Sequence, residues 1–112
     1  MTDLSPVIRA LEACSGADHE LDVNIHIALG LSGTAARHYT GSVDAAASLI
    51  PEGWRASRLC ELPRPAGLEM RWRWTAELRF FGNEDLILVA AGEGPTMALA
   101  LAAAALRARG TK

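Results

Sequence analysis

The chain has 112 residues, of which 50% are hydrophobic and 21% charged, and its formal net charge is −2. This apolar content excludes an intrinsically disordered protein, and the length fits a single domain over residues 1–112. The near-neutral charge disfavours a protein that binds nucleic acid through bulk positive charge.

Three helices are predicted in the first fifty residues, over about 4–14, 18–29 and 43–50. In the first, apolar residues recur at the i, i+3, i+4 and i+7 spacing of a buried helical stripe, and the second also has an apolar face. The residues placed to cap the three helices are Ser5, Asp18, and Thr40 or Ser42. The residues expected to face inward are Leu4, Val7, Ile8, Leu11 and Cys14, then Leu21, Ile25, Ala28 and Leu29, then Val43, Ala46, Ala47 and Ile50. Pro51–Gly53 turns the chain.

The segment Leu68–Phe80 alternates between apolar and polar side chains without a break. The apolar set is Leu68, Met70, Trp72, Trp74, Ala76, Leu78 and Phe80, and the polar set is Glu69, Arg71, Arg73, Thr75, Glu77 and Arg79. This period of two predicts a long strand with one buried face and one face in water. We therefore expect the apolar set to line the core.

Two further strands flank the long one. The first, Trp54–Leu62, loses its alternation at Arg58-Leu59, where a bulge would re-aim the side chains, and a loop over Pro63–Gly67 follows it. On the other side, Gly82–Glu84 resembles a hairpin turn that leads into a strand over Asp85–Ala91. Together the three strands predict an antiparallel meander.

A last helix is predicted with Pro95 in its first turn and Gly110 at its end. It is apolar on all sides and rich in alanine, so it is expected to lie across the sheet with a second helix or a second subunit against its back. The order α-α-α-β-β-β-α predicts an α+β fold, a three-stranded meander with helices mainly on one face.

Two stretches resemble a known family. Tyr39–Trp54, with the letters YTGSVDAAASLIPEGW, and Gly94-Pro95-Thr96 before the terminal helix are similar to small phage and prophage proteins of unknown function that are described as having an ABA-sandwich domain. The resemblance implies a phage or prophage origin and a sheet between helix layers. The polar alternation around Arg71 predicts instead that one face of the sheet is open.

The polar face of the predicted sheet is the surface on which we expect a partner to bind. Its candidate residues are Arg55, Arg71, Arg73 and Arg79, interrupted by Glu61, Glu69 and Glu77. Guanidinium groups suit an acidic protein surface or a phosphate backbone, but Trp72 and Trp74 are predicted to point the other way, which disfavours base stacking and nucleic acid. The alternative is a solvated face whose cross-strand Arg–Glu pairs contribute tenths of a kcal/mol each.

From this face and the family resemblance we expect a non-catalytic phage or prophage accessory protein. It would bind a host or phage protein in the cytoplasm of the host cell, in host take-over or in inhibition of a defence system. The longest apolar run, Met97–Leu106, is about half the length that a bilayer-crossing helix needs, so no membrane contact is expected. Two cysteines, Cys14 and Cys60, are too few for a disulfide framework and are expected to stay reduced.

A structural homodimer is an alternative function. The candidate interface residues on the last helix are Met97, Leu99, Leu101 and Leu106. The charge is also split, −4 over residues 1–50 and +2 over residues 51–112, so acidic helices of one subunit could meet the basic sheet of another. The helix is favoured, because burying apolar surface desolvates no charge.

Metal and catalytic chemistry have little support in the residues. His19, Asp22 and His26 lie within one arc of the second helix and are weak metal candidates. We interpret this arc as a solvated face, because the apolar residues of that helix lie opposite. No serine or cysteine stands in a nucleophile motif, so we expect no catalysis and no cofactor. A small-ligand protein with a pocket between the second helix and the sheet remains a further alternative.

Overall fold

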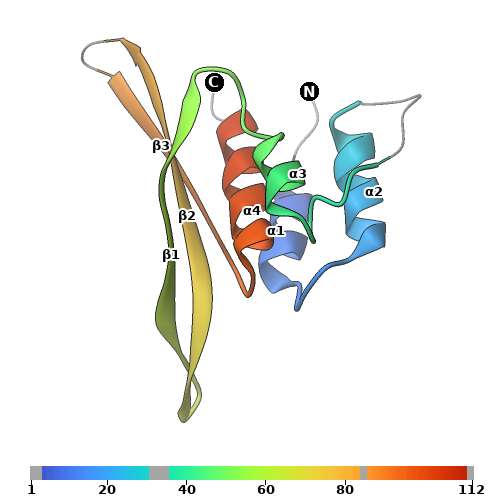
Figure 1. Ribbon diagram of the computed structural model, residues 1–112, viewed down its shortest axis with the longest axis vertical. Coiled ribbons are helices and arrows are strands. Elements are labelled where there is room, and N and C mark those ends of the chain that lie inside the picture. Colours follow the sequence, from blue (N-terminus) through green and yellow to red (C-terminus); the bar gives the residue numbers. More distant parts are fainter. Residues whose placement is uncertain (1–3, 31–35, 84–85, 111–112) are drawn as a thin grey trace.

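The computed structural model describes residues 4–30, 36–83 and 86–110. Its elements are α1 (Ser5–Ala13), α2 (His19–Ala28), α3 (Val43–Ala47), β1 (Trp54–Ala66), β2 (Glu69–Asn83), β3 (Leu86–Gly94) and α4 (Met97–Gly110). The strands form one antiparallel sheet in the order β1-β2-β3. The helices lie on one face of this sheet and leave the other face open (Figure 1). The α+β prediction, with its order of elements and its single helix-covered face, is confirmed.

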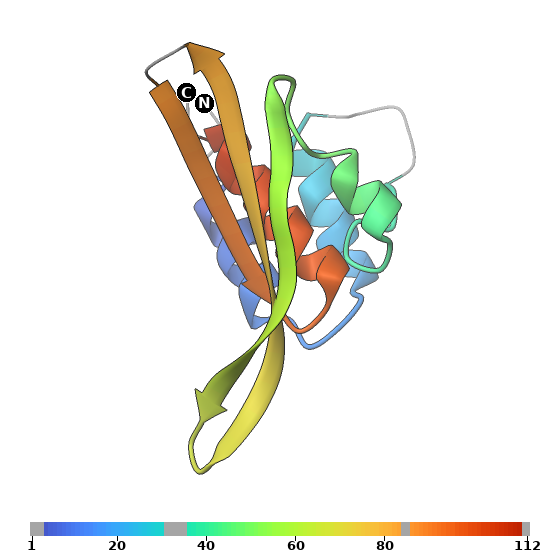
Figure 2. The same cartoon turned by 60° about the vertical axis from the view of Figure 1, so that its left-hand side comes forward.

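Helix α4 lies directly against β2 and β3, and its close approach depends on small residues (Figure 2). A Cβ built on Gly92 of β3 would fall 2.8 Å from the Cβ of Ala103, and nearer still to the backbone of Ala100 and Ala104. No side chain larger than hydrogen fits at Gly92 without moving the helix. The alanines of α4 and the glycine of β3 therefore set the distance between helix and sheet.

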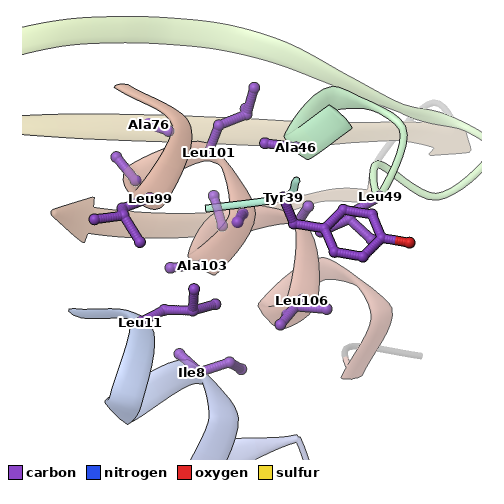
Figure 3. Close-up of a cluster of buried hydrophobic side chains, with 14 of the residues drawn as sticks. Ile8, Leu11, Tyr39, Ala46, Leu49, Ala76, Leu99, Leu101, Ala103 and Leu106 are labelled. Atoms are coloured by element: carbon purple, nitrogen blue, oxygen red, sulfur yellow. The ribbon is translucent and has the colours of Figure 1, made fainter. Parts of the chain in front are cut away.

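The other sides of α4 are covered by α1 and α3. In Figure 3, Ile8 and Leu11 of α1 point toward α4. Leu99, Leu101 and Leu106 are 0%, 4% and 0% exposed, so they belong to the core of one chain. The prediction that these three leucines form a subunit interface is wrong, because a second helix, not a second subunit, occupies the back of α4. Met97, the fourth predicted interface residue, is half-buried at the first position of the helix.

Two of the predicted helix caps are confirmed. The side chains of Asp18 and Ser42 each accept the backbone N–H three residues further on, at 3.2 and 3.3 Å. Helix α1 differs, because Leu4 occupies its cap position and Ser5 is its first residue. Helix α4 is preceded by Thr96, whose hydroxyl accepts a backbone N–H at 3.2 Å, so Pro95 lies before the first turn rather than within it.

The strands β1 and β2 are longer than predicted. The segment 63–66, expected to be a loop, belongs to β1, and the chain reverses at Gly67, whose φ is +66°. The irregularity in β1 is confirmed, but it lies between Ala56 and Arg58, with Ser57 as the extra residue. Strand β3 continues to Gly94. Of the predicted turn over 82–84, Glu84 lies outside the described residues.

Beyond the end of β3, strands β1 and β2 continue alone as a two-stranded arm, residues 62–73, which projects past the helices (Figures 1 and 2). Five register pairs span it, a length of about 16 Å. No helix covers the arm, so Met70 and Trp72 are 61% and 60% exposed and Leu68 is fully exposed. The prediction that the whole apolar set lines the core holds for Ala76 and Leu78, which are buried, and is wrong for the three residues of the arm and its tip.

Candidate protein-docking face

The open face of the sheet collects the arginines of β1 and β2. Residues that are opposite in an antiparallel register share a face, and here Arg55 is opposite Arg79 while Arg64 is opposite Arg71. Because Ser57 is an extra residue in β1, the next residue, Arg58, lies opposite Glu77 and therefore shares the open face with Arg55. Its described charged residues are Arg55, Arg58, Arg64, Arg71, Arg73, Arg79, Glu69, Glu77 and Glu93. Six arginines against three glutamates give this part of the surface a net positive charge.

Two of these arginines, Arg58 and Arg64, were not among the predicted site residues. Arg64 stands between Pro63 and Pro65, which indicated a loop from sequence. In the structure the two prolines occupy alternate positions of an edge strand, where a missing N–H is tolerated on the free side. That i, i+2 spacing is the signal from which the longer strand could have been found.

The predicted site residue Arg73 is held by contacts within the chain. Its Nε donates to Glu93 Oε1 at 2.9 Å, and its Nη2 donates to the carbonyl oxygen of Glu12 at 2.9 Å. Glu93 also lies 3.5 Å from the guanidinium of Arg64. Glu12 in turn accepts a hydrogen bond from Arg107 at 2.7 Å, which ties α1 to α4. Arg73 therefore joins the sheet to the helices and is less available to a partner than its neighbours.

The carboxylate of Glu77 neutralises part of the positive charge of the open face, in the region where helices cover the opposite side of the sheet. It accepts hydrogen bonds from Arg79 Nε at 3.0 Å and from the Ser57 hydroxyl at 3.2 Å. These two donors, the arginine first, hold the pKa of Glu77 below its ordinary value. The carboxylate thus stays charged and occupies Arg79. In contrast, Arg55 and Arg71 are exposed and form no ion pair with any described residue, and Arg58 is exposed and has only a longer-range attraction to Glu77.

The predicted metal arc of α2 is not a solvated face. Asp22 and His26 are 3% and 8% exposed, so that part of the prediction is wrong, while His19 is exposed. Asp22 is buried because the segment that leads into α3 packs on this side of the helix, where Thr40 donates to its carboxylate. Among residues 4–30, 36–83 and 86–110, no three His, Cys, Asp or Glu side chains are grouped as metal ligands.

An open surface depression of about 200 Å³ lies between α1 and α2. It is lined by Ala10, Ala13, Cys14, Asp18, Glu20, Leu21 and Asn24. The pocket predicted between the second helix and the sheet does not form among the described residues, because α2 packs on α1 and does not contact the strands.

None of the helices in the described ranges has both the length and the apolar character needed to cross a bilayer. Comparison of the chain with protein-family models, curated proteins and solved structures finds no match. Function must therefore be inferred from the surface of this chain itself.

Proposed function

We propose that this protein is a non-catalytic binding module that docks an acidic protein surface on the open face of its sheet. The observation that carries this proposal is that Arg55 and Arg58 are exposed, lie on a face that no helix covers, and donate no hydrogen bond to a described carboxylate, although Arg58 is attracted to Glu77 across the strand pair. An unpaired guanidinium can form a bidentate pair with a carboxylate, and arginine is enriched at protein interfaces.

The composition of the face favours a protein over a nucleic acid. Glu77 and Glu93 would repel a phosphate backbone, and the exposed Trp72 lies on the opposite side of the arm, where it cannot stack with a base held by Arg71. Opposite Arg79 lies Val89, which is 52% exposed. A protein interface combines apolar and charged side chains, and Val89 supplies an apolar one beside Arg79.

The family resemblance of Tyr39–Trp54 indicates where the partner would come from. We therefore propose a host or phage protein as the partner, and host take-over or inhibition of a defence system as the purpose.

The test is a pull-down from nuclease-treated lysate of the host cell, read by mass spectrometry. The variant Arg55→Glu/Arg58→Glu is compared with Arg9→Glu/Arg37→Glu, which makes the same charge change at exposed arginines outside the sheet. We expect a protein that wild type and control retain and the sheet variant loses, with affinity for the purified partner reduced roughly tenfold or more. Equal retention or equal loss in the two variants would overturn the proposal.

A further inference from the structure

Strand β3 lies at an edge of the sheet, and its sequence favours pairing with further strands. Residues 86–91 have the letters LILVAA, an unbroken apolar run without charge, proline or glycine. A run of this composition on a free sheet edge is a template for edge-to-edge association. Stable proteins therefore block the free side of such strands.

The two outer strands differ in what blocks them. In β1, the bulge at Ser57 interrupts the strand, and Pro63 and Pro65 lack the N–H that a further strand would bind. Strand β3 contains no proline, and its residues pair with β2 in succession up to Gly94. Protection of β3 therefore has to come from side chains of other elements.

Side chains of α1 and α4 occupy the free side of β3 in its C-terminal half. The carboxylate of Glu12 accepts the backbone N–H of Glu93 at 3.2 Å, and the guanidinium of Arg107 donates to the carbonyl oxygen of Ala91 at 2.8 Å. Figure 2 shows α1, in blue, beside this half of β3. Two backbone groups that a neighbouring strand would bind are thus already taken.

Further hydrogen bonds fix Glu12 and Arg107 in place. Arg107 donates to both carboxylate oxygens of Glu12, at 2.5 and 2.7 Å, which is a bidentate ion pair. Arg73 of β2 donates to the carbonyl oxygen of Glu12 and to the carboxylate of Glu93, each at 2.9 Å. Helices α1 and α4 and strands β2 and β3 therefore meet at this pair.

We propose that Glu12 and Arg107 form an edge guard, which keeps β3 from pairing with β3 of a second copy of this chain. The backbone groups of a strand alternate in direction, so those of Val89 point to the same free side as those of Ala91 and Glu93. The guard restricts this free side to residues 86–90. Its removal would make the free side continuous to residue 93.

A second copy is the occupant that the guard excludes, because two identical strand edges are self-complementary when they pair antiparallel about a two-fold axis. The apolar run 86–91 would then face its own copy. This inference does not depend on the docking face, because the guard lies at the β3 edge and contacts neither Arg55 nor Arg58.

The first test is hydrogen exchange of single backbone amides in the wild type, measured by NMR. We expect the amide of Glu93, which Glu12 binds, to exchange at least roughly tenfold more slowly than the amide of Val89 on the same edge. Equal exchange rates at these two positions would overturn the proposal.

The second test removes the guard. Glu12→Ala deletes the carboxylate, and the matched control Glu52→Ala deletes an exposed carboxylate from the turn before β1. By light scattering and native mass spectrometry, we expect Glu12→Ala to associate at protein concentrations at least roughly tenfold lower than the wild type and the control. Association of Glu12→Ala at the concentration of the control would contradict the guard.

A proline then separates strand pairing from loss of the fold. Ala91→Pro removes an N–H on the free side and no hydrogen bond to β2, so an edge strand tolerates it. We expect the double variant Glu12→Ala/Ala91→Pro to return to the association of the wild type. A double variant that associates as readily as Glu12→Ala alone would show that β3 pairing is not the cause, and the proposal would fail.

Discussion

The buried carboxylate of Asp22 accepts two hydrogen bonds from Thr40, one from its backbone amide and one from its hydroxyl, each at 2.8 Å. The same hydroxyl accepts the backbone N–H of Asp18 at 2.8 Å. One aspartate therefore fastens the segment before α3 to the first turns of α2. This polar contact holds α2 in place, where its packing partner among the helices and strands is α1 alone in the described chain.

Replacing Asp22 with alanine should destabilise the protein by roughly 1–3 kcal/mol, because the buried backbone amide of Thr40 loses its acceptor, while the hydroxyl keeps only the carbonyl oxygen of Asp18. Urea unfolding followed by circular dichroism measures the change. The control is Asp44→Ala, which removes an exposed carboxylate from the first turn of α3 and should cost less than about 1 kcal/mol. Similar losses in the two variants would show that the Asp22–Thr40 contact is not structural.

The order of elements and the caps of α2 and α3 could be predicted because the signals are local. Asp18 and Ser42 cap helices through hydrogen bonds to backbone N–H groups three residues further on. The alternation in Leu68–Phe80 is likewise a property of a single strand. A periodic pattern states that two faces of a strand differ. It does not indicate how far along the strand the helices extend. For that reason the alternation wrongly predicts that Met70 and Trp72 lie in the core.

The candidate site depended on tertiary contacts that no local pattern carries. Whether Arg58 shares a face with Arg55 depends on a bulge whose position was predicted one residue too late. Asp22 is buried by a segment eighteen residues further along the chain. The apolar surface of α4 indicates that more than one side of this helix is buried. Only the three-dimensional structure shows that the covering element is a helix of the same chain.

Gly92→Ala should be destabilising by roughly 1–3 kcal/mol or more, because the added methyl group would meet the backbone of α4. Gly16→Ala is the matched control, since nothing lies within 4 Å of a Cβ at that position. Thermal unfolding of both variants provides the measurement. If Gly92→Ala unfolds at the temperature of the control, the close approach of β3 and α4 is incorrect.

Leu99→Asp should unfold the chain rather than yield a stable monomer, because it places a carboxylate in the core of a single chain. Met70→Asp, on the exposed arm, should keep the native circular dichroism spectrum and thermal transition. A folded, monomeric Leu99→Asp protein would instead support an interface on α4.

The pKa of Glu77 gives a prediction for pH. Its folded-state pKa lies below the ordinary value because Arg79 and Ser57 donate to the charged carboxylate. The contribution of Glu77 to stability is therefore present above the unfolded-state pKa and is lost as the pH falls through the lowered folded-state pKa. An NMR titration of the side-chain carboxyl should have a midpoint below that of an ordinary glutamate, and Arg79→Gln should raise it. An unchanged midpoint in Arg79→Gln would contradict this assignment.

The most direct test of a docking face on the open side of the sheet is site-specific photo-crosslinking in cells that produce the protein. A photoreactive amino acid is placed either at Val89, 52% exposed on the open face, or at Ile27, 70% exposed on α2. We expect a discrete covalent adduct with one protein from position 89, its loss in Arg55→Glu/Arg58→Glu, and no such adduct from position 27. The same adduct from position 27, or none from position 89, would contradict this expectation.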